Sequence, residues 1–96
     1  MTVDELRVEV EGIVSNLNSS GFDVVDAETI EKLDKLSVGA GELGMKEGRH
    51  LIENLSGAMK AIKDGKSQAG SGMVRLTALD FYLKKLAASN TRIEDL

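Results

Sequence analysis

Apolar residues recur along the chain at helical spacing, most clearly between Gly44 and Gly65. Within this stretch they lie three, four or seven positions apart, which places them on one face of a helix with about 3.6 residues per turn. They are Met45, Ile52, Leu55, Met59 and Ile62, widened by Leu51 and Ala58. Charged residues fill most of the remaining positions, and Gly65 is a suitable C-terminal cap. The pattern predicts an amphipathic helix whose apolar face must be covered by other segments.

The first twenty residues form a second helical pattern. Thr2 followed by Glu5 is typical of a capping box, in which the side chain of each residue accepts the backbone N–H of the other. Behind this start the apolar residues keep a heptad-like seam, and Val8 falls outside it. The seam consists of Val3, Leu6, Val10, Ile13, Val14 and Leu17. The sequence therefore predicts a first helix that ends between Asn18 and Gly21.

A short apolar connector leads to the next predicted helix. It contains Phe22, Val24 and Val25, and we expect Phe22 to close one end of the bundle. Asp26 is a good N-cap for the helix that follows, because its side chain can accept a free backbone N–H of the first turn. The expected buried face consists of Ile30, Leu33, Leu36 or Ser37, Ala40 and Leu43.

The junction after this helix is rich in glycine and can be interpreted in two ways. Gly39, Gly41, Gly44 and Gly48 follow one another closely. In the first interpretation the helix ends between Gly41 and Gly44, and the next helix begins near Met45. In the second, one long bent helix extends from residue 27 to residue 64. Each glycine inside a helix costs about 1 kcal/mol relative to alanine, so the break is the preferred prediction.

The last predicted helix begins near Met73, after a connector that contains glycine and serine, and extends to about Ser89. Its main stripe is Met73, Leu76, Leu79, Leu83 and Leu86, and Val74, Ala78, Phe81 and Tyr82 extend it around the helix. Exposed together, Val74, Phe81 and Tyr82 would form a patch of the kind that marks an interaction surface. We therefore expect a homo-oligomer, or a complex with another protein, built on this helix.

Together these patterns predict an all-α protein, a small up-down bundle of four helices, or of three if the second and third are fused. A chain of 96 residues is long enough for one domain with a thin core, here residues 1–96 with a frayed tail at 91–96. The core must be aliphatic, because the chain has only two Phe, one Tyr and no Trp. It contains no cysteine, which excludes disulfides and thiolate metal ligands. We expect no cofactor.

The charge pattern narrows the classes of partner. The net charge is −4; residues 1–44 hold ten acidic and three basic residues, and residues 45–96 hold six acidic and nine basic ones. An acidic chain with few aromatic rings does not suit nucleic acid, which is bound through neutralised phosphates and stacked bases. No apolar run approaches the roughly 20 residues of a membrane span, and the acidic N-terminal segment is unlike a signal peptide. We expect a cytoplasmic protein that binds neither nucleic acid nor membrane, with its acidic and basic helices paired within the chain.

His50 is the only histidine, and carboxylates lie on both sides of it. Glu47 and Glu53 are three residues before and after it, on the same side of the helix. A histidine on a helix of a four-helix bundle resembles the plan of histidine phosphotransfer domains, and this resemblance implies an imidazole that accepts a phosphoryl group. Those domains have the motif H-x-x-K-G, where this chain has Glu53 and Asn54. The resemblance is therefore one of architecture only.

Three other interpretations of His50 stay open. The spacing Glu47-x-x-His50 matches the pairs of di-iron carboxylate bundles, although a complete site needs two such pairs and two further glutamates. A surface histidine between carboxylates could also sense pH, or take part in ordinary ion pairs on the helix surface. We predict no catalytic residues and no metal ligands. The leading prediction is a non-enzymatic helical protein–protein interaction module, self-associating or an adaptor, and the alternative is histidine phosphotransfer through His50.

Overall fold

Four helices make up the part of the chain that the structure describes. The computed structural model describes residues 1–22 and 25–95, with side chains up to residue 88, so Val24 of the predicted connector lies outside it. The helices are α1 (Val3–Ser20), α2 (Ala27–Glu42), α3 (Lys46–Lys63) and α4 (Ala69–Asp95). The described residues contain no β-strand. The predicted all-α bundle of four helices is confirmed.

The two predicted N-caps are confirmed. The backbone N–H of Thr2 donates to Oε1 of Glu5, and the N–H of Glu5 donates to Oγ1 of Thr2, each over 3.1 Å. The bond from the Thr2 backbone lowers the pKa of the Glu5 carboxyl below its ordinary value. At the start of α2, Oδ1 of Asp26 accepts the N–H of Glu28 over 2.9 Å. These caps satisfy backbone donors that a helix start otherwise leaves free.

The glycine-rich junction is a break between α2 and α3, as preferred. Gly44 has a φ of 78°, in the left-handed region that residues with a Cβ disfavour. The N–H of Met45 bonds to the carbonyl of Ala40 over 2.9 Å, and the N–H of Gly44 bonds to that of Gly41 over 3.1 Å. This pair of hydrogen bonds is the Schellman motif, which ends a helix. The alternative of one bent helix from 27 to 64 is wrong.

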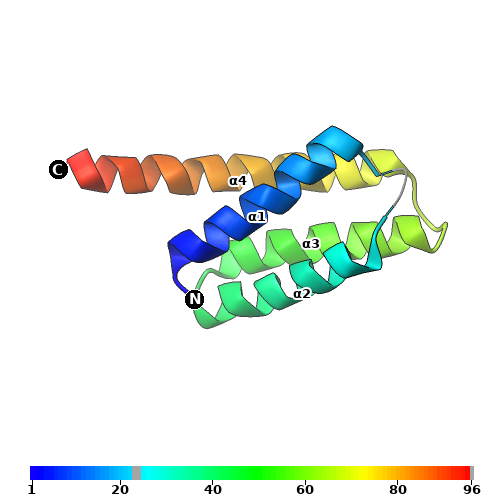
Figure 1. Cartoon of the computed structure of the whole chain (residues 1–96), viewed down its shortest axis with the longest axis horizontal. Coiled ribbons are helices and arrows are strands. Elements are labelled where there is room, and N and C mark those ends of the chain that lie inside the picture. Colours follow the sequence, from blue (N-terminus) through cyan, green and yellow to red (C-terminus); the bar gives the residue numbers. More distant parts are fainter. Residues whose placement is uncertain (23–24, 96) are drawn as a thin grey trace.

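The helices alternate in direction along the bundle (Figure 1). α2 and α3 lie antiparallel, α4 packs against α3, and α1 runs obliquely and contacts both α2 and α4. At about 1.5 Å per residue, the 27 residues of α4 span roughly 40 Å. Its C-terminal end therefore projects past the other helices (Figure 1), and the molecule measures 48 × 24 × 18 Å.

α4 is longer than the sequence predicted at both ends. It begins at Ala69, before the predicted start near Met73, and it continues to Asp95, beyond the predicted end. Its first turns include Gly72, which is buried beneath the ring of Phe22. The segment that the sequence analysis assigned to a connector is therefore partly helical. The predicted fraying of residues 91–96 stays a prediction.

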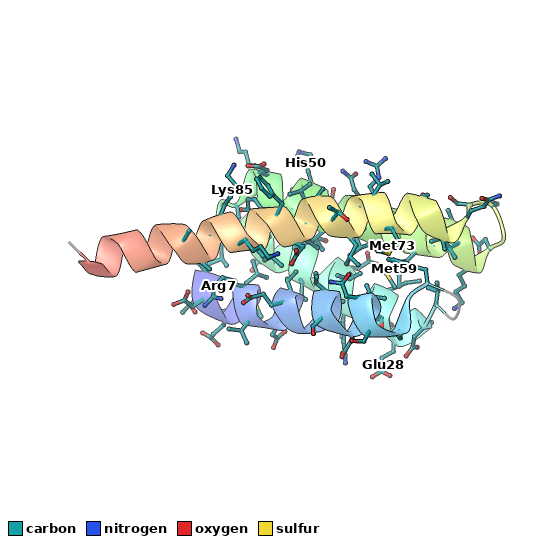
Figure 2. The ribbon with its side chains drawn as sticks, turned by 90° about the horizontal axis from the view of Figure 1, so that it is seen from above. Arg7, Glu28, His50, Met59, Met73 and Lys85 are labelled. Atoms are coloured by element: carbon teal, nitrogen blue, oxygen red, sulfur yellow. The ribbon has the colours of Figure 1, made fainter. Side chains whose placement is uncertain are left out.

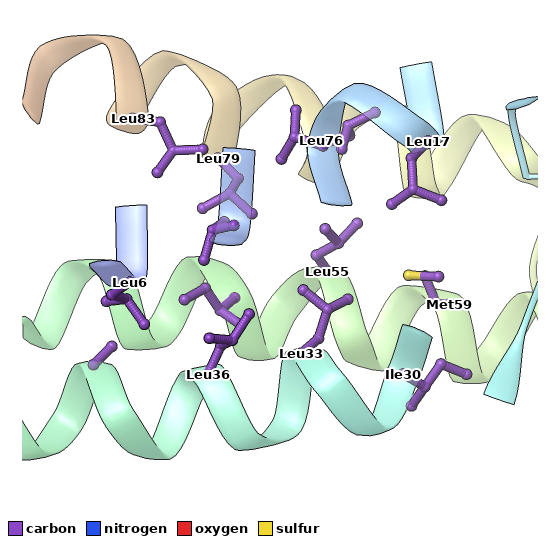
Figure 3. Close-up of a cluster of buried hydrophobic side chains, with 14 of the residues drawn as sticks. Leu6, Leu17, Ile30, Leu33, Leu36, Leu55, Met59, Leu76, Leu79 and Leu83 are labelled. Carbon is purple, nitrogen blue, oxygen red and sulfur yellow. The ribbon is translucent and has the colours of Figure 1, made fainter. Parts of the chain in front are cut away.

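One aliphatic core joins the four helices (Figure 3). Its buried members are Leu6, Val10, Val14 and Leu17 of α1, Ile30, Leu33, Leu36 and Ala40 of α2, Ile52, Leu55 and Met59 of α3, Leu76, Leu79 and Leu83 of α4, and Phe22. The expected positions of Leu55 and Leu83 are confirmed, with exposed fractions of 0% and 4%. Phe22 is buried at one end of the bundle, as predicted, and Val8, outside the seam of α1, is exposed. None of the helices in the described part combines the length and the hydrophobicity that a membrane crossing requires.

Candidate functional site

His50 lies exposed on the outer surface of α3. Figure 2 shows it on the same edge of the molecule as Lys85 of α4. Glu47 and Glu53 are exposed as well, and Oε1 of Glu53 accepts a hydrogen bond from Nε of Arg49 over 2.8 Å. The carboxylate of Glu53 is thus held by Arg49, one turn before it on the same helix. The imidazole itself is open to solvent.

The pattern Glu47-x-x-His50 does not build a metal site in the described residues. A di-iron bundle site requires its glutamates and histidines to project into the core from facing helices, and Glu47 and His50 both lie on the outside of α3. Among residues 1–22 and 25–88, no group of three or more His, Asp and Glu side chains is placed to hold a metal ion. The di-iron interpretation is therefore not supported by this geometry.

The side of α4 that points away from the core carries exposed apolar residues beside the exposed Thr77 and Lys85. Val74 and Phe81 are two turns apart and so lie on one side of the helix, with Ala78 between them. Val74 is 67% exposed and Phe81 65% exposed, and Ala78 is exposed too. This side, which we call the outer face of α4 (Val74, Ala78 and Phe81), is opposite to the core stripe of Leu76, Leu79 and Leu83. Nζ of Lys85 lies 5.6 Å from the centre of the Phe81 ring, within reach of a cation–π interaction.

Tyr82, which the sequence grouped with Val74 and Phe81, is half-buried between α4 and α3. Its hydroxyl lies against Gly48, where a Cβ would be only 3.0 Å away. Burial, and next the negative charge of Glu47, raise the pKa of the Tyr82 hydroxyl above its ordinary value. Because Gly48 leaves room for the ring, Tyr82 joins two helices of the same chain and adds only its exposed edge to the surface around Phe81.

A polar cluster that the sequence analysis missed links α2 to α3. Oγ of Ser56, a residue only 1% exposed, donates to Oδ1 of Asp34 over 2.6 Å, and Nζ of Lys60 lies 3.1 Å from Oδ2. The hydrogen bond from Ser56, followed by the contact with Lys60, lowers the pKa of the Asp34 carboxyl. Ser56 occurs beside Leu55 on the apolar face of α3, and a serine at such a position is a signal that a partner is needed. Asp34 and Lys60 also pair an acidic helix with a basic one, as predicted from the charge pattern.

Comparisons with known proteins suggest no function for this site. The chain matches no protein-family description, and no curated protein or solved structure was found to resemble it significantly.

Proposed function

We propose that this protein is a non-enzymatic helical interaction module that forms a two-fold symmetric dimer through the outer face of α4. The observation that supports it is the exposure of Val74 and Phe81, 67% and 65%, on the side of α4 opposite to the core. A helix at the edge of a bundle buries one stripe and keeps its other side polar. An apolar outer face is best explained by a partner that covers it.

The size of the exposed surface supports the same proposal. The chain exposes 6121 Å², whereas a compact monomer of its 10.3 kDa mass would expose about 5,400 Å². A molecule of 48 × 24 × 18 Å is elongated and exposes more surface than a compact one of the same mass. Association would remove part of it from water, and burial of apolar surface is the main favourable term in protein association.

A second copy is the partner that fits this face best. Two-fold dimers are the commonest soluble oligomers, and in them the same patch of each chain contacts the other. A single helix carries the whole outer face, so two copies of α4 can pack along each other without a separate complementary surface. The other form of this proposal is an adaptor that binds a different protein through the same face. A cytoplasmic location stays a prediction.

The test is the mass of the protein in solution at micromolar concentration, measured by sedimentation equilibrium. We expect a dimer for the wild type and a folded monomer for Phe81→Glu, because the change removes the aromatic ring and the burial of a charged carboxylate in its place is costly. The matched control is Val38→Glu on α2, where the valine is 61% exposed but lies on another helix. This control should stay dimeric. A monomeric wild type, or loss of the dimer in both variants, would refute the assignment.

One observation favours the alternative of histidine phosphotransfer: His50 is exposed on α3 of a four-helix bundle, where a phosphoryl donor could reach it. Glu53, at the position of the lysine in the motif of those domains, would repel the phosphoryl group. Incubation with a phosphorylated receiver domain should label wild type and not His50→Gln if this alternative holds. Absence of an acid-labile label on wild type would dismiss it.

A further inference from the structure

α1 and α2 enclose an open groove on the surface of the bundle. Figure 1 shows the two helices diverging from the N-terminal end of α1. The groove has a volume of about 510 Å³, within the range of small-molecule sites. It is lined by Met1, Glu9, Gly12, Ile13, Asn16, Lys32, Lys35 and Leu36. A smaller hollow of about 210 Å³ shares Ile13, Asn16 and Lys32 with it, so the hollowed surface continues along the junction of the two helices.

The apolar part of the groove comes from Ile13 of α1, Leu36 of α2 and Met1. Gly12 widens it, because a Cβ placed on this residue would meet nothing within 4 Å. A glycine in the interior of a helix costs stability relative to alanine. Gly12 is exposed, so the surface beside it is open to solvent.

Two lysines place positive charge on one rim of the groove. Lys32 and Lys35 are one turn apart on α2, and they are two of the three basic residues within positions 1–44. None of the ion pairs in the described part of the chain includes either of them. Glu9 lies on the opposite wall, on α1. The rim with the two lysines therefore attracts an anionic group, and Glu9 on the opposite wall repels any second negative charge.

We propose that this groove binds an amphiphile with one aliphatic chain and one singly charged anionic head, such as a fatty acid. Lys32 and Lys35 hold the carboxylate, and the chain lies along Ile13 and Leu36, beside Gly12. Two cations favour an anion, the apolar floor favours a hydrocarbon chain, and Glu9 disfavours ligands that carry several negative charges. This site is separate from the outer face of α4 and does not depend on the proposed dimer.

The experiment is a titration of the full chain, labelled with ¹⁵N, with decanoate, followed by the shifts of its backbone NMR signals. We expect saturable shifts at Gly12, Ile13 and Leu36. Decanol, which keeps the chain and lacks the charge, and decyltrimethylammonium, which reverses it, should each bind at least roughly fivefold more weakly. Equal affinity for decanol or for the cation would overturn the role of the lysines, and absence of saturable shifts at millimolar decanoate would overturn the site.

Three variants locate the ligand. Gly12→Leu should abolish binding by filling the groove; its Cβ meets nothing within 4 Å, and leucine is a better helix former than glycine. Its control, Gly57→Leu on α3, is made at another exposed glycine with nothing within 4 Å of a Cβ and should bind as wild type. The double change Lys32→Gln and Lys35→Gln should weaken decanoate and leave decanol unchanged. Circular dichroism establishes that each variant is folded.

A last measurement tests whether ligand binding at this site is independent of the dimer. The monomer expected from Phe81→Glu should bind decanoate with wild-type affinity, since Phe81 is not among the lining residues. Loss of binding in Phe81→Glu, or unchanged binding in Gly12→Leu, would place the ligand elsewhere and overturn the proposal.

Discussion

The ring of Phe22 packs directly on the backbone of α4 at Gly72. A Cβ at Gly72 would lie 2.8 Å from Cε1 of Phe22, closer than such atoms approach, and 3.0 Å from Cδ1 of Ile62, a tight contact. The contact ties the connector after α1 to the first turns of α4, and it buries Phe22 to 3% exposure. Gly72 is therefore required by its neighbour, although it is a poor helix former.

Gly72→Ala should destabilise the protein by about 1–3 kcal/mol, because the added methyl group overpacks the end of the core. The gain in helix propensity, about 1 kcal/mol, works in the opposite direction. Urea denaturation of both proteins gives the difference in the free energy of unfolding. In a Phe22→Leu background, where the ring is gone, the same change should cost less or become favourable. An equal cost in both backgrounds would show that Phe22 is not the cause.

Gly44→Ala should also destabilise the protein, by about 1 kcal/mol or more, because Gly44 has a φ of 78°. The matched control is Gly57→Ala, at a helical glycine with open space around its Cβ position, which should stabilise by up to about 1 kcal/mol. Thermal or urea unfolding of the two variants should therefore move in opposite directions. A stabilised Gly44→Ala variant would be incompatible with the Schellman motif at the end of α2.

The sequence predicted most of the helices and their buried faces, because burial of an amphipathic helix follows its own periodicity. Met73, which the sequence placed in the main stripe of the last helix, is an exception, at 41% exposed. The cap at Thr2 and the break at Gly44 were predictable for the same reason: their causes lie within a few residues. The start of α4 was not predictable, because Gly70, Ser71 and Gly72 have the composition of a connector. Of these, Gly72 packs against Phe22, a contact between residues far apart in the chain that the sequence pattern does not show.

The surface of α4 also depends on contacts between helices that the spacing within one helix does not show. The exposure of Val74 and Phe81 follows from their position opposite to the core stripe, whereas the partial burial of Tyr82 depends on the missing side chain of Gly48 on another helix. The bond between Ser56 and Asp34 also joins two helices. Sequence spacing within one helix carries no information on such pairs.

Asp34 should make stability depend on pH. Its pKa is lower in the folded chain than the ordinary value, about 3.9, of an unfolded aspartate. The stabilisation is therefore present above the unfolded pKa and is lost as the pH falls through the folded one. Asp34→Asn, which can still accept the Ser56 hydrogen bond, should lower stability at pH 7 by up to about 1 kcal/mol, a modest effect because the Asp34 side chain is 48% exposed.

The measurement is urea denaturation of wild type and Asp34→Asn at a series of pH values from 7 downward. The difference between them should be constant at neutral pH and shrink below about pH 4. Glu31→Gln, at an exposed carboxylate of the same helix that takes part in none of the ion pairs of the described part, should show little difference from wild type. A difference for Asp34→Asn that does not change with pH would refute the linkage.

The proposed dimer should have its two copies of α4 antiparallel. In a parallel pair, Lys85 of both chains would lie side by side and repel each other, whereas an antiparallel pair moves the two lysines to opposite ends. With the two-fold axis near Ala78, Val74 of one copy then faces Phe81 of the other.

The chain has no cysteine of its own, so single cysteines report this arrangement directly. Under mild oxidation Ala78→Cys should form a linked dimer and Val74→Cys alone should not, because its two copies would be about 10 Å apart along the helices. A mixture of Val74→Cys and Phe81→Cys should form the mixed disulfide, and efficient linking of Val74→Cys to itself would instead establish a parallel pair.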